Sequence, residues 1–238
     1  MNKFYFKDKE VNKIKKEVVI TGAGSGLGQA LAKKISRNGD KVYLIGRTKT
    51  KLEVTAKNLE NPFEIHQLDI RKREDVEKVF SKINRIDILI NNAGIGKFGK
   101  VENLKKKDID QMIDTNLKGT IFCTQSVLKK MKKVNNGHIV NIISTAGKKG
   151  KSTESVYCAS KFGIRGFTDS LEKELKESKI DVSAFYMGGM NTPFWDDILT
   201  EEKKEKFMNP SDVAEIIFAN IKDRDKLNVK EVLINSKR

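Results

Sequence analysis

A glycine-rich octapeptide near the start of the chain limits the folds available to it most strongly. Residues 21–28 read TGAGSGLG and lie between the apolar run VVI and the segment QALAKKIS. Glycine in a helix interior costs roughly 1 kcal/mol relative to alanine, so four glycines within seven residues argue against a helix there. The composition instead predicts a turn whose bare backbone must approach another group closely.

Short runs rich in valine and isoleucine alternate with longer segments of helical periodicity. The expected strands read EVVIT, KVYLIG, FEIHQL, IDILIN, GHIVNII, DVSAFYM and EVLIN. One helical segment, GLGQALAKKISRNG, places Leu27, Ala30, Leu31 and Ile35 on one face and reaches Gly39, a residue suited to a helix C-terminus. This alternation predicts an α/β fold: a single-domain, doubly wound parallel sheet of about seven strands with helices on both faces.

The 238 residues include only three prolines and no linker-like tract, which favours one domain. We divide the chain into an N-terminal extension at residues 1–16 and a domain at residues 17–238. A segment at about 188–209 interrupts the strand–helix alternation and is interpreted as a lid. No run is long and apolar enough for a signal peptide or a membrane helix, so we expect a cytoplasmic protein without a membrane partner.

The formal net charge of +15 raises the question of nucleic-acid binding. The lysines, however, are spread along the chain and often alternate with acids, and no basic motif with interleaved aromatic residues is present. A solvated lysine-rich surface is the preferred interpretation, and no nucleic-acid partner is expected. Cys123, Cys158, His66 and His138 lack the spacing of metal ligands, so no metal site is predicted.

The glycines have a specific use in such a fold. A glycine-rich turn between the first strand and the first helix is where a dinucleotide pyrophosphate binds, because backbone N–H groups and the helix N-terminus face the anion. The common G-x-G-x-x-G pattern fails here, since its third glycine falls on Leu27 or Gln29. The pattern that fits is T-G-x-x-x-G-x-G, formed by Thr21, Gly22, Gly26 and Gly28.

This spacing resembles the short-chain dehydrogenase/reductase family, and further motifs follow in the family's order over roughly residues 17–234. NNAG occupies residues 91–94, TNLKG contains Asn116, and Ser144 lies thirteen residues before the tyrosine of YCASK. GGMNTP supplies Gly188 and Thr192, with Met187 where the family has proline. The resemblance implies a Rossmann-like fold and a homodimer or homotetramer formed through the helices that carry Asn116 and Tyr157.

Tyr157 and Lys161 are four residues apart, so a helix places them on one face, about 5–6 Å apart at Cβ. A tyrosine pKa lies near 10, and a neighbouring ammonium favours the phenolate. We therefore expect Lys161 to lower the pKa of Tyr157 and make the pair an acid/base. Ser144, after the fifth strand, is expected to hydrogen-bond the substrate oxygen.

The resemblance assigns the remaining roles. It implies that Lys161 also holds the ribose of the nicotinamide half, Asn116 maintains a water relay, Asp69 contacts adenine and Thr192 bonds the carboxamide. The expected catalytic residues are Ser144, Tyr157, Lys161 and Asn116. The expected cofactor-binding residues are Thr21, Gly22, Gly24, Ser25, Gly26, Leu27, Gly28, Arg47, Thr48, Asp69, Asn92, Ala93, Gly94, Tyr157, Lys161, Gly188 and Thr192.

The end of the second strand predicts which dinucleotide binds. Enzymes of this fold that prefer NAD usually place an acid there, which accepts hydrogen bonds from the adenosine ribose. This chain has Gly46 at that position, followed by Arg47 and Thr48. A guanidinium can pair with a 2′-phosphate that an acid would repel, so we predict NADP(H), with NAD(H) the weaker cofactor.

The substrate stays open at this stage. A small carbonyl or secondary alcohol is expected, and Met190, Phe194 and Trp195 either line its pocket or pack the lid. Lys148, Lys149 and Lys151 near the site mouth are either solvated or favour an anionic substrate such as a 3-oxo acid or acyl thioester. The alternative function is a non-catalytic NADP(H)-binding regulator on the same fold, although such proteins typically lose the tyrosine or lysine that this chain retains.

Overall fold

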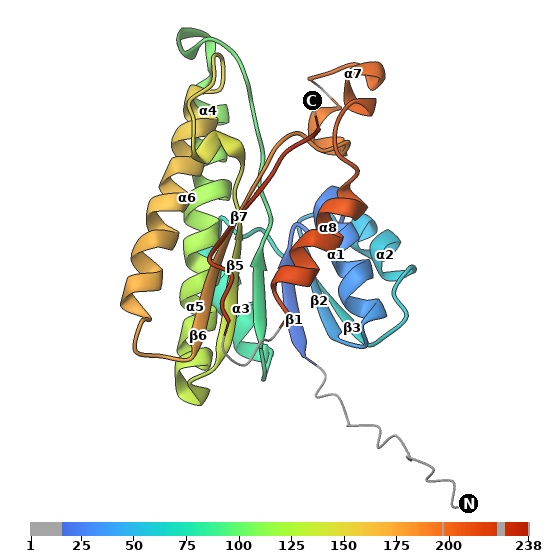
Figure 1. Cartoon of the computed structure of the whole chain (residues 1–238), viewed down its shortest axis with the longest axis vertical. Coiled ribbons are helices and arrows are strands. Elements are labelled where there is room, and N and C mark those ends of the chain that lie inside the picture. Colours follow the sequence, from blue (N-terminus) through green and yellow to red (C-terminus); the bar gives the residue numbers. More distant parts are fainter. Residues whose placement is uncertain (1–15, 197, 223–226, 238) are drawn as a thin grey trace, which may run out of the picture.

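A computed structural model describes residues 16–196, 198–222 and 227–237, so the predicted N-terminal extension, except Lys16, lies outside the described residues. Within these ranges, seven parallel strands form one sheet in the order β3-β2-β1-β4-β5-β6-β7, which confirms the predicted fold class (Figure 1). The strands are β1 (Glu17–Thr21), β2 (Lys41–Gly46), β3 (Phe63–Gln67), β4 (Ile88–Asn91), β5 (Gly137–Ile142), β6 (Ile180–Met187) and β7 (Glu231–Ile234).

Helices cover both faces of this sheet. One face carries α1 (Gly26–Arg37), α2 (Lys49–Ala56) and α8 (Pro210–Asn220), and the other carries α3 (Arg73–Lys82), α5 (Gly119–Val134) and α6 (Ser155–Glu174). Figure 1 shows α1, α2 and α8 together on one side and α5 and α6 on the other. Successive strand residues point to opposite faces, so Val18 and Ile20 of β1 pack under the first group of helices and Val19 under the second.

The first helix ends as the sequence predicts. After Arg37, the C-cap residue Asn38 keeps a helical backbone, and Gly39 adopts a φ of 91°. A positive φ favours glycine because it lacks a Cβ, and the N–H of Gly39 bonds the carbonyl of Ser36 at 2.8 Å. The turn sends the chain back into β2, which pairs with β1.

The strand order creates an opening at one edge of the sheet. The chain runs outward from β1 to β2 and β3, then returns to place β4 on the other side of β1. The connections after β1 and β4 therefore leave in opposite directions. In open α/β sheets, ligands bind in the crevice at the carboxyl ends of the strands at this point.

Shorter elements surround that edge. They are η1 (Val101–Asn103), α4 (Lys106–Met112), the π-helical segment η2 (Ile113–Lys118), η3 (Thr145–Gly147), η4 (Pro193–Trp195) and α7 (Glu201–Glu205). The segment predicted as a lid contains η4 and α7, and its two ends meet in a parallel bridge between Met190 and Met208. No helix within the described ranges is both long and apolar enough to cross a membrane.

Candidate active site

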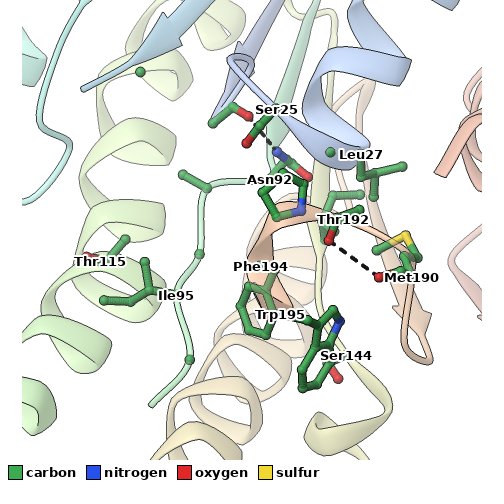
Figure 2. Close-up of a pocket in the computed structure, with 18 of the residues that line it drawn as sticks. Ser25, Leu27, Asn92, Ile95, Thr115, Ser144, Met190, Thr192, Phe194 and Trp195 are labelled. Carbon is green, nitrogen blue, oxygen red and sulfur yellow. Dashed lines mark hydrogen bonds between the residues drawn. The ribbon is translucent and has the colours of Figure 1, made fainter. Parts of the chain in front are cut away.

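A cavity of about 560 Å³ lies at the carboxyl ends of the strands, where β1 and β4 diverge. Most of the residues predicted for the site line it: Gly22, Gly24, Ser25, Gly26, Leu27, Arg47, Thr48, Asp69, Asn92, Ala93, Gly94, Ser144, Tyr157, Lys161, Gly188 and Thr192. Figure 2 shows Ser25, Leu27 and Asn92 at one end of this cavity and Phe194, Trp195 and Ser144 at the other. Three predicted residues, Thr21, Gly28 and Asn116, are placed behind the lining rather than in it.

The glycine turn needs its glycines for two physical reasons. Gly22 and Gly26 adopt φ values of 67° and 52°, which strain any residue with a Cβ. A Cβ on Gly28 would lie 2.2 Å from the carbonyl oxygen of Gly22, and one on Gly22 would lie 2.9 Å from the Cα of Ala93. Gly28 therefore allows α1 to pack tightly on the turn, which explains its place behind the lining.

Side chains from β1 and from the residue that follows β4 hold the turn in position. The Thr21 hydroxyl accepts hydrogen bonds from the backbone N–H groups of Asn92 and Ala93, both at 3.0 Å. The Asn92 side chain donates to the carbonyl of Thr21 at 2.9 Å and to that of Gly22 at 3.3 Å. Thr21 thus supports the turn, while Asn92 both supports it and lines the cavity.

The N-terminus of α1 faces the same space. Its first residues, Ser25, Gly26 and Leu27, line the cavity, and the Ser25 side chain makes no capping hydrogen bond to the described helix. The first N–H groups of a helix have no partner within it, and the helix dipole favours an anion there. Together with the bare glycine backbone, this donor set fits a pyrophosphate.

Three polar side chains of the segment after β2 line the cavity beside that turn: Arg47, Thr48 and Lys51. The carbonyl of Arg47 accepts a hydrogen bond from Gln67 at 2.9 Å, which fixes the backbone, while the arginine side chain is exposed. Lys51 lies against the glycine turn, because a Cβ on Gly24 would come within 3.0 Å of the Lys51 Cβ. The sequence prediction missed Lys51, which lies on the first turn of α2, four residues after Arg47.

Asp69 lies two residues beyond β3 and lines the cavity. The Arg71 guanidinium donates to both of its carboxylate oxygens, at 2.5 and 3.0 Å. Hydrogen bonds from Arg71 hold the pKa of Asp69 below its usual range, and Arg47 adds a smaller electrostatic contribution. Asp69 is therefore ionised at neutral pH, with Arg71 as its main partner.

Tyr157 and Lys161 lie in the first half of α6, near Ser144, which follows β5 by two residues. Tyr157 and Lys161 are 8% and 5% exposed, and the Lys161 ammonium lies 5.8 Å from the centre of the Tyr157 ring. The Lys161 ammonium donates to the carbonyl of Ile142 at 3.2 Å. The Ser144 hydroxyl is close enough to Tyr157 to hydrogen-bond it and partly lower its pKa.

The expected lowering of the Tyr157 pKa by Lys161 is wrong for this structure. Burial raises the pKa of Tyr157 well above its ordinary value, and the bond to Ser144 offsets this only in part. Burial also lowers the pKa of Lys161 to about 8. The spacing of the two residues predicted their proximity, but desolvation favours the neutral form of each and is the largest cause of both pKa shifts.

Asn116 lies in the π-helical segment η2 and is fully buried. Its side chain accepts a hydrogen bond from the N–H of Ile95 at 2.8 Å and donates to the carbonyl of Ile95 at 2.9 Å. It also donates to the Ser160 hydroxyl at 3.0 Å. Asn116 therefore ties the loop after β4 to α6, next to Tyr157 and Lys161.

Aromatic side chains line the end of the cavity beside Tyr157. The rings of Phe98 and Phe194 lie 5.4 and 6.0 Å from the Tyr157 ring. Trp195 stacks on Phe98 at 5.6 Å and also contacts Phe207 at 5.4 Å. Phe194 and Trp195 line the cavity and pack the lid at the same time, so both interpretations of these residues hold, and Met190 lines the cavity beside them (Figure 2).

Of the three lysines expected near the mouth, the structure places only Lys151 in the lining. Lys148 turns away from the cavity and forms an ion pair with Glu231 at 2.6 Å, with its ammonium 4.0 Å from the centre of the Tyr186 ring. The lining also contains Lys97 and Glu154, which the sequence prediction missed. Glu154 was detectable, because it precedes Tyr157 by one helical turn.

Comparisons with known proteins agree with this architecture. A family model described as short chain dehydrogenase matches residues 16–203. An uncharacterized oxidoreductase of Staphylococcus epidermidis is 32% identical over 227 residues, covering 93% of this chain and 98% of the relative. A short-chain dehydrogenase/reductase from Vibrio parahaemolyticus superposes with a TM-score of 0.84 at 31% identity, covering 92% and 100% of the two chains. The closed form of a serine dehydrogenase complexed with NADP+ has a TM-score of 0.85 at 31% identity, covering 91% and 93%.

Proposed function

This chain belongs to the short-chain dehydrogenase/reductase family, and we propose that it is an NADP(H)-dependent oxidoreductase acting on a carbonyl or secondary alcohol. One observation carries the proposal: a single cavity joins a glycine turn and helix N-terminus at one end to Ser144, Tyr157 and Lys161 at the other. The first end suits a dinucleotide pyrophosphate and the second suits proton transfer. A purely regulatory nucleotide binder has no need of the second end.

The residues of the glycine turn would hold the pyrophosphate through backbone N–H groups, and Arg47, Thr48 and Lys51 would hold the adenosine end. Asp69 would contact the adenine, and Thr192, which packs against Gly26, would bond the carboxamide. When bound, the nicotinamide supplies or accepts the hydride, which is chemistry that the protein side chains lack.

The side chains at the other end handle the proton. In the reductive direction, Tyr157 donates its hydroxyl proton to the substrate oxygen as that oxygen gains negative charge. Ser144 donates a hydrogen bond to the same oxygen and so fixes its distance from Tyr157. The Lys161 ammonium stabilises the resulting phenolate, which then regains a proton from solvent by way of the Asn116 region.

Preference for the phosphorylated dinucleotide follows from the segment after β2. That strand ends at Gly46 rather than at an acid, and Arg47 lines the cavity with an exposed guanidinium. Arg71, not Arg47, is the main partner of Asp69. A 2′-phosphate can therefore form charge-assisted hydrogen bonds with Arg47, with Lys51 as a second cation close by. The serine dehydrogenase that this chain resembles was solved as a complex with NADP+.

The test compares both dinucleotides in wild type and in Arg47→Ala. We expect wild-type kcat/KM for NADPH to exceed that for NADH at least about tenfold, or roughly 1.4 kcal/mol. Arg47→Ala should remove most of this difference and leave the NADH kinetics unchanged. Lys49→Ala is the matched control, because Lys49 lies on α2 outside the cavity lining and pairs with Glu53 at 3.7 Å. Equal efficiency of wild type with NADH would contradict the preference.

A further inference from the structure

Glu154 is an acidic side chain in the wall of the catalytic end of the cavity, and the proposed function gives it no role. It immediately precedes α6 and lies one helical turn before Tyr157. Its side chain is only 17% exposed, and it is near enough to Tyr157 that its charge raises the pKa of the phenol. Burial in turn raises the pKa of the Glu154 carboxyl itself.

The backbone that presents Glu154 is unusual. Thr153 adopts a φ of 64°, a left-handed conformation that is rare for a β-branched residue. Its carbonyl accepts a hydrogen bond from the N–H of Gly99 at 2.8 Å, so the loop after β4 holds this turn in place. Backbone strain of this kind persists where the surrounding structure enforces it and often marks a functional site. Here it fixes where the chain enters α6 and therefore where Glu154 lies.

Among the described residues, the one ion pair of Glu154 is a long contact with Lys151. The Lys151 ammonium lies 3.9 Å from its carboxylate, beyond hydrogen-bonding distance, and is itself 40% exposed. The other acid in the cavity lining, Asp69, is bound by Arg71 at the opposite end. Glu154 is thus the one carboxylate beside Tyr157 among the described lining residues. A carboxylate accepts hydrogen bonds and donates none, so its complement is a donor, above all a cationic one.

We infer that Glu154 is a specificity-determining residue that selects substrates with an ammonium group on the carbon next to the reacting C–O group, that is, amino alcohols and the corresponding amino ketones. This inference rests on the proposed function, because Tyr157 must bind the reacting oxygen for Glu154 to reach the neighbouring group. The aromatic wall of Phe194 and Trp195 then contacts the rest of a small substrate.

The test uses three alcohols of the same shape: 1-amino-2-propanol, 1,2-propanediol and 2-butanol. They differ only in the group carried by the CH2 next to the carbinol carbon, which is an ammonium, a hydroxyl or a methyl. Trp195 is the only tryptophan in the chain and lines the cavity, so its fluorescence reports binding without any turnover. NADPH formation from NADP+ is measured in parallel. The variants are wild type, Glu154→Gln, and Glu102→Gln as a control, since Glu102 is exposed and outside the cavity lining.

We expect wild type and Glu102→Gln to bind 1-amino-2-propanol at least about fivefold more tightly than 2-butanol, with the diol between them. Glu154→Gln should lose the preference for the amine but keep that for the diol, because an amide oxygen still accepts a hydrogen bond from a hydroxyl. Equal binding of the three alcohols by wild type, no response of Trp195 to any of them, or an amine preference that survives in Glu154→Gln would overturn the inference.

The two measurements separate the two proposals. If the fluorescence ranking appears but no alcohol yields NADPH, the role of Glu154 stands and the proposed oxidoreductase function fails for these compounds. If NADPH forms at rates that do not depend on the ammonium group, the proposed function stands and the role of Glu154 fails.

Discussion

Tyr157 and Lys161 are both buried, and burial moves their pKa values in opposite directions. It raises the pKa of the Tyr157 phenol and lowers that of the Lys161 ammonium to about 8. At neutral pH, Lys161 is still mostly protonated, but it loses its proton far earlier than an exposed lysine does. The Lys161 charge, which we propose stabilises the Tyr157 phenolate, is therefore present below about pH 8 and lost above it.

A pH profile tests this protonation. The value of kcat/KM for the carbonyl, at saturating NADPH, reports ionisations of the enzyme form to which the carbonyl binds. We expect this kcat/KM to be constant below about pH 7 and to fall about tenfold for each pH unit above about pH 8. Tyr157 titrates well above this range, so the fall belongs to Lys161.

Two variants control the assignment of that fall. Lys148→Met removes a lysine that pairs with Glu231 outside the cavity lining, and it should leave the profile unchanged. Lys161→Arg stays charged at every accessible pH and should move the fall upward. A wild-type profile that remains level about two units beyond pH 8 would refute the role given to Lys161.

Individual side chains also show where inference from sequence ends. The turn glycines and the Tyr157/Lys161 pair were predictable because each depends on local spacing and backbone sterics. The direction of the Lys148 side chain could not be predicted from the sequence, since its partner Glu231 is 83 residues away in the chain. The strained backbone of Thr153, which positions Glu154, likewise depends on a hydrogen bond from Gly99.

At the scale of elements, the segment predicted as a lid contacts the main core clusters through Met190 and Met208, near its two ends, rather than through residues 194–206. The fully buried apolar residues of the two main core clusters lie outside residues 194–206. Within that segment, Lys204 pairs with Asp196 at 2.7 Å and Glu201 at 2.5 Å, which connects η4 to α7. Phe194 and Trp195 are half-buried, against the small cluster around Tyr157.

Replacement of the lid tests its role. Residues 194–206 cannot simply be deleted, because the bridge between Met190 and Met208 is parallel, and parallel segments need a long connection. We expect a glycine/serine segment of equal length to preserve the fold and NADPH binding but to raise the KM for a carbonyl substrate at least about tenfold, since the apolar wall is lost. Thermal melting and NADPH fluorescence check the first expectation, and steady-state kinetics check the second. Loss of a cooperative melting transition would place the segment in the core instead.

At the scale of the whole molecule, the strand order places both halves of the site at one edge of the sheet. The seven-stranded parallel sheet and its helices were predictable, because short Val/Ile-rich runs alternate with helical periodicity throughout the chain. The joint position of Arg47, Asp69, Ser144 and Tyr157 around one cavity depends on the crossovers between strands, and the resemblance to a known family supplied it. The expected homo-oligomer stays a prediction.

The most direct test of the proposed function is NADPH oxidation by wild type and Tyr157→Phe over a panel of 3-oxoacyl thioesters, diketones, aldehydes, steroid ketones and amino ketones. Tyr186→Phe is the matched control, because it removes a tyrosine hydroxyl that bonds Glu231 at 3.1 Å outside the cavity lining. We predict that wild type and Tyr186→Phe reduce at least one carbonyl of the panel, and that Tyr157→Phe still binds NADPH but has a kcat lower by at least ~10²-fold. Turnover by Tyr157→Phe at close to the wild-type rate would contradict the account.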